Sequence, residues 1–494
     1  MQKKGKLELT WVGKYDDQKP VEPRILVEDR EKSYGDPDSD NMLIHGDNLI
    51  ALQALQQDFA GKIKCIYIDP PYNTGSAFEY YDDGIEHSIW LSMMRPRLIL
   101  LRELLADDGF IFVQIDDNEQ AYLKILMDEV FGRECYVNQI VWKRRGGSAN
   151  PRNRLNNVTD YILLYAKTAG TILNPIFTKE DENTKKYIEE RFRYVDENGR
   201  KYMKSPIQSP NPRPNLMYEY KGYRVPQKGW SISREVMEQW DKEGRLAFPD
   251  DKSKTINRKI FLDEYRGQPI NSLWTDIFVI NPMSGERVNF DGQKPEALIQ
   301  RVLEMASSEG DWILDSFLGS GSTAVTAQKM HRKWIGIEMR EQVYTLCKKR
   351  IDATIDGVQG GISEAVNWQG GGGYHFYELA PSLLVKNDKL PIYQINPAYT
   401  FEMLCEAICK IEGFKYELRD VFHGHSSEKR FIYVTTEFVN AEYIRSLSQH
   451  LNEEQSLLIY ATKIQSDMML PDNIEVKKIP KDLLNKCSFE SEVR

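Results

Sequence analysis

The chain has 494 residues, of which 41% are hydrophobic and 28% charged, as in an ordinary globular protein of two or three folding units. No run of about 18 apolar residues occurs, which excludes a membrane-spanning helix, and the first residues lack the apolar stretch of a secretory signal. The formal net charge is −9, so any contact with nucleic acid has to come from a local cluster of basic residues.

Six cysteines are scattered through the chain. Their low number and irregular spacing are typical of reduced thiols, and we expect a cytoplasmic protein. Cys405 and Cys409 are four residues apart on an expected helix, upstream of His423 and His425. This spacing matches no common zinc site, so we expect two buried helix cysteines and no metal.

Residues 1–40 are polar, contain several prolines, and are expected to form an N-terminal arm. From 41 to 170, short apolar runs alternate with amphipathic stretches, which predicts a parallel sheet with helices on both faces. The expected strands cover 42–45, 63–69, 109–115, 137–142 and 161–165, and the expected helices cover 48–58, 90–105 and 121–131. Ligands of such sheets bind at the carboxyl ends of the strands, which here carry Asp47, Asp69 and the loop after Ile115.

A basic cluster lies between the last two of these strands. It consists of Lys143, Arg144, Arg145, Arg152 and Arg154, with no acidic residue among them. Basic side chains at this density can contact the phosphates of a nucleic acid, but a solvated basic loop has the same pattern. Composition alone leaves both interpretations open.

From 171 to 275 the alternation is lost, and prolines and aromatic residues mix with basic ones, which indicates an inserted domain. Residues 276–355 return to the earlier pattern, with a helix expected over 295–306 and strands over 312–315 and 334–338. A glycine-rich stretch ending at Gly373 indicates a linker over 356–374. Residues 375–494 are expected to form a small C-terminal α+β domain, with a strand over 431–435 and a helix after Asn440.

A turn with two glycines joins the expected strand 312–315 to the next helix. Its sequence is Asp315-Ser316-Phe317-Leu318-Gly319-Ser320-Gly321. Glycines at this place let the backbone approach a ligand at a helix N-terminus, and Glu338 ends the next strand where an acid can bind ribose hydroxyls. No Gly-Lys-Ser/Thr follows, and the third glycine of a dinucleotide site is missing, so an adenosyl ligand without a pyrophosphate fits better.

Asp69-Pro70-Pro71-Tyr72, at the end of the expected strand 63–69, is the stronger signal. The prolines have no backbone N–H, so their carbonyls can only accept hydrogen bonds. The Asp69 carboxylate adds a second acceptor, and two acceptors at one point suit an amino group. The Tyr72 ring offers a stacking face for a planar base. The tetrapeptide alone could equally terminate a strand.

Together, the two motifs resemble those of the amino-group DNA methyltransferases. The catalytic motif precedes the cofactor motif, as in their beta class, in which the Rossmann-like α/β sheet is circularly permuted. Tyr67-Ile68-Asp69-Pro70-Pro71-Tyr72-Asn73-Thr74-Gly75 and Tyr374-His375-Phe376-Tyr377-Glu378-Leu379 further resemble the modification (Mod) subunits of type III restriction–modification systems. The similarity runs from about Leu43 to Glu338, interrupted by the insert.

The resemblance implies an adenine-N6 methyltransferase that uses S-adenosylmethionine and has Asp69-Pro70-Pro71-Tyr72 as its catalytic tetrad. Asp69 and the Pro70 carbonyl are expected to hold the target amine, and Tyr72 to stack on a base extruded from the duplex. In-line attack on the sulfonium methyl needs positioning and no metal.

The resemblance also assigns a cofactor site. Phe317, Gly319 and Gly321 are expected to line the methionine part, with Asp315 and Thr323 in the same turn, and Glu338 to bind the ribose. Asp47 is expected at the cofactor adenine, with a structural turn aspartate as the alternative. Tyr161 is considered as the other wall of the base pocket, with a core tyrosine as the alternative.

The implied partner is double-stranded DNA, with residues 171–275 reading its sequence and Lys143, Arg144, Arg145 and Arg152 contacting it. The resemblance also implies a homodimer, with 375–494 as a contact surface, and a separate helicase-nuclease subunit. The sequence has no Gly-x-x-x-x-Gly-Lys-Ser/Thr loop for a translocating ATPase of its own.

Three alternatives remain open at this point. A cytosine-N4 methyltransferase would use the same geometry, although Ser is more usual before its prolines. A protein-glutamine methyltransferase usually has Asn at the position of Asp69 and lacks such an insert. A non-catalytic DNA-binding subunit would not bind the cofactor.

Overall fold

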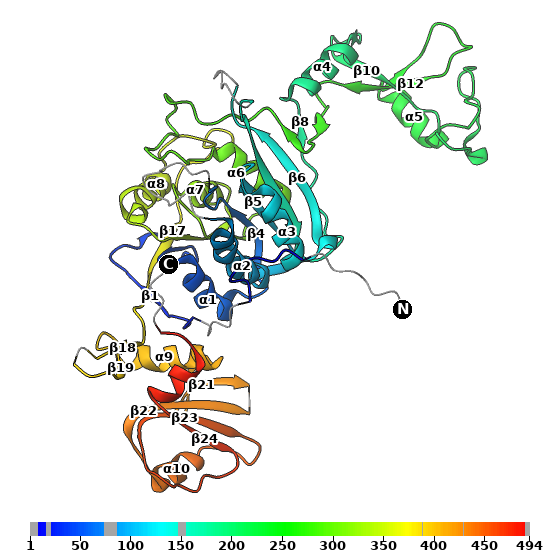
Figure 1. Ribbon diagram of the computed structural model, residues 1–494. Coiled ribbons are helices and arrows are strands. Elements are labelled where there is room, and N and C mark those ends of the chain that lie inside the picture. The colour runs from blue at the N-terminus through cyan, green and yellow to red at the C-terminus, as the bar shows by residue number, and fades with distance from the viewer. Residues whose placement is uncertain are drawn as a thin grey trace. The chain divides into compact units, whose positions relative to one another are not determined.

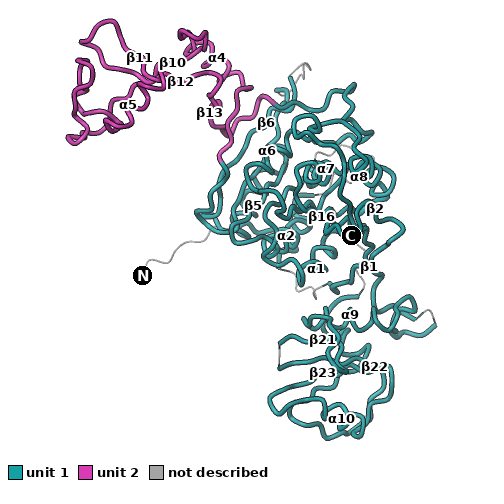
Figure 2. Tube along the Cα trace, turned by 180° about the vertical axis from the view of Figure 1, so that it is seen from behind, with its two compact units in different colours: residues 1–174, 277–494 teal, residues 175–276 magenta. Residues whose placement is uncertain are grey.

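The computed structural model describes residues 8–15, 21–73, 86–146, 155–387, 389–427 and 429–489 (Figure 1). The chain divides into two compact units, one of residues 1–174 and 277–494 and one of residues 175–276 (Figure 2). Among the helices in the described ranges, none has the length and apolar character needed to cross a bilayer.

A large sheet forms the centre of the first unit. Its spatial order is β1 (Leu26–Glu28), β17 (Gly373–Leu379), β3 (Met42–His45), β16 (Lys333–Glu338), β15 (Trp312–Asp315), β4 (Ile63–Ile68), β5 (Leu105–Ile115), β7 (Thr159–Ala166) and β6 (Tyr136–Lys143), and β2 (Tyr34–Gly35) pairs with β17. Neighbouring strands from β17 to β5 are parallel, whereas β7 runs antiparallel to both β5 and β6.

Five of these strands reproduce the 3-2-1-4-5 order of the Rossmann fold, with β15 as the first strand, β16 as the second and β3 as the third. In the chain, however, β15 and β16 follow β3, β4 and β5. The connectivity is therefore circularly permuted, which confirms the predicted α/β fold with a permuted Rossmann-like sheet.

Two helical layers cover this sheet because successive strand side chains point to opposite faces. α1 (Asn48–Phe59), α2 (His87–Leu104) and α3 (Gln120–Phe131) share a core with Ile66, Ile68 and Val113. α6 (Glu296–Ala306), α7 (Ser322–Lys329) and α8 (Lys348–Ile355) pack in sequence on the other side. The short turns η1 (Arg133–Cys135) and η3 (Val343–Cys347) complete this region.

The C-terminal part of the first unit has its own five-stranded sheet. Its order is β20 (Lys415–Arg419), β21 (Phe422–Ser427), β22 (Arg430–Val439), β23 (Ser456–Ile464) and β24 (Ile474–Lys478), after a hairpin of β18 (Leu384–Lys386) and β19 (Tyr393–Ile395). α9 (Phe401–Glu412) and α11 (Lys481–Lys486) share one core, and α10 (Ala441–Ser448) belongs to another. β22 and α10 confirm the predicted strand and helix, and Cys405 and Cys409 are buried in α9.

The structure places three segments differently from their expected domains. The expected arm contributes β1 and β2 to the central sheet, and β17 places residues 375–379 in that sheet instead of the C-terminal domain. The expected linker over 356–374 is packed, since Trp368 is buried and its Nε1 donates to the Thr354 carbonyl at 2.8 Å. Short strands whose partners lie hundreds of residues away leave no local periodicity from which they could be predicted.

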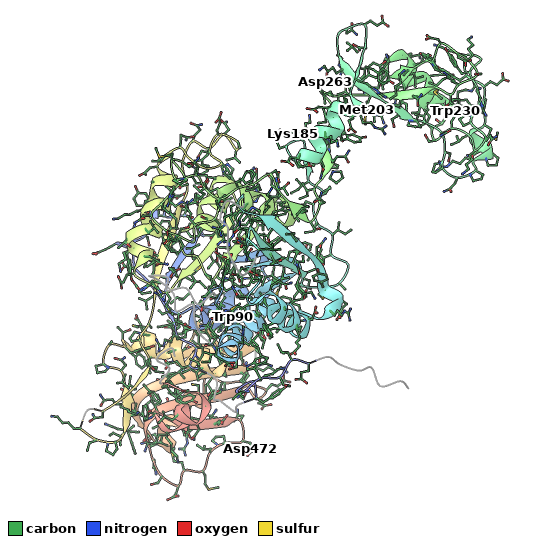
Figure 3. The ribbon with its side chains drawn as sticks, turned by 45° about the horizontal axis from the view of Figure 1, so that its top comes forward. Trp90, Lys185, Met203, Trp230, Asp263 and Asp472 are labelled. Carbon is green, nitrogen blue, oxygen red and sulfur yellow. The ribbon has the colours of Figure 1, made fainter. Side chains whose placement is uncertain are left out.

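The second unit is the continuous segment Pro175–Asp276, in the region where an insert was expected over 171–275. It contains a sheet of β11 (Leu246–Ala247), β12 (Asn257–Phe261), β10 (Lys201–Pro206) and β9 (Tyr194–Val195), and a pair of β8 (Phe177–Thr178) with β13 (Gln268–Pro269). α4 (Glu182–Arg191), η2 (Pro214–Leu216) and α5 (Arg234–Lys242) complete it, and β14 (Leu273–Trp274) follows β13 in the chain. Trp230, which is labelled in Figure 3, and Met237 lie in a hydrophobic core that belongs to this unit.

Candidate active site at the strand-order reversal

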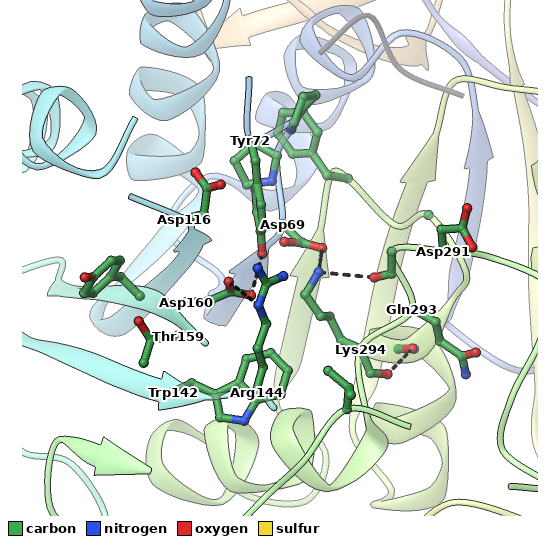
Figure 4. Close-up of a pocket in the computed structure, with 18 of the residues that line it drawn as sticks. Asp69, Tyr72, Asp116, Trp142, Arg144, Thr159, Asp160, Asp291, Gln293 and Lys294 are labelled. Atoms are coloured by element: carbon green, nitrogen blue, oxygen red, sulfur yellow. Dashed lines mark hydrogen bonds and ion pairs between the residues drawn. The ribbon is translucent and has the colours of Figure 1, made fainter. Parts of the chain in front are cut away.

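A cavity of about 1070 Å³ opens at the carboxyl ends of β4, β5 and β15 (Figure 4). β4 and β15 are adjacent parallel strands at the point where the strand order reverses, which is where doubly wound sheets bind ligands. Small-molecule pockets usually measure roughly 300–1,000 Å³, so this cavity has room for more than one ligand group.

Asp69 follows β4 directly and presents its carboxylate to the cavity. Its Oδ2 forms an ion pair with the ammonium of Lys294. Its Oδ1 is buried and receives no hydrogen bond from the residues that the structure describes. Because a buried acceptor without a donor costs free energy, this oxygen is suited to receive a hydrogen bond from a ligand.

The two prolines after Asp69 set the direction of the chain at the cavity wall. The Pro71 carbonyl accepts a hydrogen bond from Trp90 Nε1 of α2 at 2.8 Å, which fixes the turn. The Pro70 carbonyl belongs to a cavity-lining residue, and within the described ranges no group donates to it. Two acceptors, the Asp69 carboxylate and the Pro70 carbonyl, are therefore available side by side in the sequence.

Tyr72 lines the same cavity with its ring. Its hydroxyl donates to Asp160 Oδ2 at 3.4 Å, and Lys294 Nζ lies 5.2 Å from the ring centroid. Burial, followed by the charge of Asp69, raises the pKa of Tyr72 well above its ordinary value, so the phenol stays neutral. Thr74 and Gly75 of the same motif lie outside the described residues.

A second carboxylate, Asp160 on β7, lies in the wall beside Tyr72 and is 1% exposed. It accepts a hydrogen bond from Gln114 Nε2 at 3.1 Å, and Gln114 accepts one from the Tyr67 hydroxyl at 2.5 Å. Burial raises the pKa of Asp160, whereas the nearby charges of Lys294 and Arg144 lower it. Asp116, after β5, also lines the cavity, and burial raises its pKa to about 6.

Asp315 ends β15 and organises the glycine turn. Its Oδ1 accepts from the Phe317 backbone N–H at 2.9 Å and its Oδ2 from Thr323 Oγ1 at 2.6 Å. Burial raises the pKa of Asp315 to about 7. Gly319 and Gly321 have φ angles of +54° and +80°, in the left-handed region that favours glycine.

Glu338 at the end of β16 holds the same turn. Its Oε2 accepts from the Gly319 N–H at 2.8 Å and its Oε1 from the Arg340 N–H at 3.1 Å. Burial raises the pKa of Glu338. Phe317, Gly319 and Thr323 line the cavity, whereas Gly321 and Glu338 lie behind the lining.

The Asp47 carboxylate is engaged elsewhere. Its Oδ1 caps α1 by accepting from the N–H groups of Leu49 and Ile50, at 2.9 and 3.2 Å, and its Oδ2 pairs with Arg97 at 3.1 Å. Asp47 does not line the cavity. Its predicted contact with a cofactor adenine therefore stays a prediction, and the geometry favours the alternative of a structural turn residue.

The residues predicted to bind DNA have different surroundings. Arg144 pairs with buried Asp160, whereas Arg145 is exposed, and its Nη2 donates to the Asn157 carbonyl at 3.4 Å. Lys143 ends β6, Tyr161 of β7 lines the cavity, and Arg152 lies outside the described residues. Arg144 is thus not part of a freely solvated basic loop.

Sequence reasoning missed Lys294, Asp160 and Gln114. Lys294 comes 225 residues after Asp69, and no local pattern connects them. The sequence offers one indication, which is the place of Lys294 just before an expected helix. A cation there is unfavourable to the helix dipole, which suggests that the residue has a function other than stabilising the helix. Asp160 and Gln114 lie in strands, where a polar residue among apolar neighbours could have been noted as a buried group in need of partners.

A Rossmann-like sheet with acceptors on one side of its switch point and a glycine turn on the other defines the α/β methyltransferase class. The chain belongs to the DNA methylase family, whose profile matches residues 63–349.

The HindVI Mod subunit of a type III restriction–modification enzyme from Haemophilus influenzae is 35% identical over 80% of this chain and 61% of its own length. The StyLTI Mod subunit of Salmonella typhimurium is 31% identical over 66% of this chain and 54% of its own length. The type II methyltransferase M.EcaI of Enterobacter cloacae is 33% identical over 60% of this chain and 66% of its own length. The chain thus spans between 54% and 66% of these relatives.

Among solved structures, a DNA modification methylase from Thermus thermophilus complexed with S-adenosyl-L-methionine is 15% identical, with a TM-score of 0.36, over 69% of this chain and all of that one. This likeness is too distant for any detail of its site to be transferred.

Proposed function

We propose that the protein transfers a methyl group from S-adenosylmethionine to the N6 amine of an adenine turned out of double-stranded DNA, as the modification component of a restriction–modification system. The observation that carries this proposal is the buried, unpartnered Oδ1 of Asp69 in a cavity that also contains Tyr72 and the glycine turn. The family membership and the Mod relatives support the DNA substrate.

Asp69 Oδ1 and the Pro70 carbonyl accept the two hydrogens of the target amine. Held in this way, the nitrogen lone pair leaves conjugation with the ring and points along the line of attack. Tyr72 stacks on the base, whose extrusion is required because an amine inside a duplex cannot reach the cavity. After the transfer, Asp69 is placed to accept the proton that the amine nitrogen loses.

The glycine turn fits an adenosyl ligand. A Cβ on Gly319 would meet the Phe290 ring at 3.3 Å, so glycine keeps the turn open toward the cavity. Phe317 and Gly319 would hold the methionine part, and Asp315, Thr323 and Glu338 keep the turn in shape. The contact of Glu338 with the ribose stays a prediction. When bound, S-adenosylmethionine supplies a methyl carbon whose bond to sulfur breaks with the electron pair left on sulfur.

The measurement that decides the base is nucleoside analysis. Double-stranded DNA is incubated with the protein and S-adenosylmethionine that carries a labelled methyl group, and is then digested to nucleosides. Label in N6-methyladenine is expected, and Asp69→Ala should lose it while still binding the cofactor. Label in N4-methylcytosine would show that the target is cytosine and not adenine. If the folded protein did not bind the cofactor, a non-catalytic subunit would be favoured.

The second unit is the candidate for reading DNA, and one face of its sheet carries basic and aromatic side chains. Lys204 on β10 lies directly opposite Lys259 on β12. Lys204 Nζ is 4.2 Å from the centroid of the Tyr194 ring, and Lys259 Nζ is 5.3 Å from that of Tyr202. Like charges directly opposite each other destabilise a sheet, and DNA phosphates would relieve this repulsion.

Lys204→Ala with Lys259→Ala is therefore expected to weaken DNA binding and to lower its dependence on salt by about one or two released counterions. The control is Lys185→Ala with Lys186→Ala, whose side chains pair with Glu180 and Glu190 on the same unit. Equal effects of the two double variants on DNA binding would contradict the proposal that this face of the sheet contacts DNA.

Three further parts of the proposal rest on the resemblance in the motifs and on the few, scattered cysteines. A separate helicase-nuclease subunit would cut DNA, two copies of the chain would form a dimer through 375–494, and the assembly would act in the cytoplasm. Copurification of a helicase-nuclease chain and the mass of the purified protein in solution test the first two.

A further inference from the structure

Lys294 interacts with both parts of the active site, namely with Asp69 after β4 and with Ser322 at the start of α7. Its ammonium pairs with Asp69 Oδ2 and donates to the Gly292 carbonyl at 3.1 Å (Figure 4). Its side chain is 13% exposed, and that of Asp69 is 20% exposed. The pair is thus shielded from most solvent, where an ion pair orients its partners more strongly than in bulk water.

The backbone of Lys294 is anchored on the cofactor side. Its carbonyl accepts a hydrogen bond at 2.8 Å from the hydroxyl of Ser322, which is the first residue of α7. Glu296, two residues later, is buried and pairs with Lys329 at 2.8 Å and with Arg350 at 3.0 Å. The position of the ammonium is therefore tied to the turn that opens α7, as well as to Asp69.

The two carboxylate oxygens of Asp69 differ in their partners, and this difference indicates the effect of the ion pair with Lys294. Lys294 engages Oδ2, and Oδ1 is the oxygen without a partner among the described residues. A carboxylate held at one oxygen cannot rotate freely, so the other oxygen keeps its direction. The target amine can approach Oδ1 without displacing Lys294.

We propose that Lys294 is a positioning residue for methyl transfer. It fixes the Asp69 carboxylate so that Oδ1 faces the target amine, and it links this orientation to the glycine turn at the start of α7. It also places a positive charge among Asp69, Asp160 and Asp315, whose carboxylates influence one another. The inference rests on the proposed methyltransferase function and adds a residue to it.

Steady-state kinetics with matched variants test this role. Lys294→Ala is expected to lower kcat by about 10- to 100-fold, because small misplacements of reacting groups have effects of this size. The KM for DNA and the affinity for S-adenosylmethionine should change by less than about threefold, because the variant removes an interaction that matters mainly in the transition state. Lys294→Arg should keep more activity than Lys294→Ala.

Chemical rescue separates positioning from a merely structural role. Ethylammonium added to Lys294→Ala can fill the vacated space and pair with Asp69, and should raise kcat. It should leave the wild type and the control Lys333→Ala unchanged, since Lys333 forms an exposed pair with Asp40. Lys294→Met, which keeps the length of the side chain, replaces the alanine variant if that variant does not fold.

Two results would overturn the inference. An unchanged or higher kcat in Lys294→Ala would mean that the ammonium only blocks the amine site. A joint loss of kcat and cofactor binding, without rescue by ethylammonium or arginine, would mean that Lys294 only supports the fold. A wild-type protein that methylates no DNA would instead refute the proposed function, so the two failures are distinguishable.

Discussion

Arg144 and Asp160 form an ion pair in the wall of the active-site cavity, with Arg144 Nε 3.2 Å from Asp160 Oδ1. The Asp160 side chain is 1% exposed and that of Arg144 is 26% exposed. The contact does not have the geometry of a hydrogen bond, so the attraction is mainly between the charges. Arg144 therefore neutralises a buried carboxylate and is less available to DNA than the exposed Arg145.

Replacement of Arg144 should mainly change stability, whereas replacement of Arg145 should mainly change DNA binding. Arg144→Gln removes one of the two cations, with Lys294, whose charges favour the buried Asp160 carboxylate, and should lower the free energy of unfolding by about 1–3 kcal/mol. Arg145→Gln should leave stability unchanged and weaken DNA binding at low salt. Urea unfolding and DNA titrations measure both. Asp160→Asn added to Arg144→Gln should recover stability, and a further loss instead would contradict this assignment.

Tyr72 is expected to act through its ring. Tyr72→Phe keeps the stacking face and loses a long hydrogen bond to Asp160, at 3.4 Å, so it should retain most activity. Tyr72→Ala should weaken capture of the extruded base by about 1–3 kcal/mol, the usual contribution of one stacked base. Fluorescence of 2-aminopurine at the target position reports base extrusion. Equal losses in the two variants would point to the hydroxyl instead.

Asp47→Asn separates the two interpretations of Asp47. In the structure its carboxylate caps α1 and pairs with Arg97, whose side chain is 8% exposed. We expect a loss of about 1–2 kcal/mol in the free energy of unfolding, because the buried arginine loses its counter-charge. Affinity for S-adenosylmethionine should stay within about twofold, below 1 kcal/mol. A large loss of cofactor affinity with intact stability would restore the cofactor role.

Asp315 should make stability depend on pH. Burial raises its pKa from 3.8 to about 7, so between these values the folded protein holds a proton that the unfolded chain has released. Stability contributed by this group therefore falls as pH rises from about 4 to 7, and is constant above that range. Asp315→Asn removes this dependence. The unfolding free energy of the variant minus that of the wild type should then increase across this window, as urea titrations at several pH values can measure. A difference independent of pH would contradict the prediction.

The fold was largely accessible from the sequence because its central strands are continuous apolar runs. Residues 63–69 and 109–115 became β4 and β5, and their alternation with helices was sufficient to predict the class of sheet. β1, β2 and β17 were not accessible, since none of them is a continuous apolar run and each pairs with a segment remote in the chain. Pairing of this kind depends on tertiary packing, which local periodicity does not report.

The candidate site was accessible only where one short segment carries several groups. Asp69 and Tyr72 lie within four residues, and Asp315 and Gly319 within five, so their association is visible in the sequence. Lys294 and Asp160 reach the cavity from other elements, and only the folded sheet brings them to Asp69 and Tyr72. Asp47 differs from these residues, because its position near a strand end suggested a contact with a ligand. In the structure its carboxylate caps α1 and pairs with Arg97.

The second unit is one uninterrupted stretch of the chain with a hydrophobic core of its own, between β7 and α6. A single recombination event in the gene could therefore exchange Pro175–Asp276 and leave every strand that builds the cavity unchanged. On the proposal that this unit reads DNA, such an exchange would change the methylated sequence and leave the residues of the cavity unchanged.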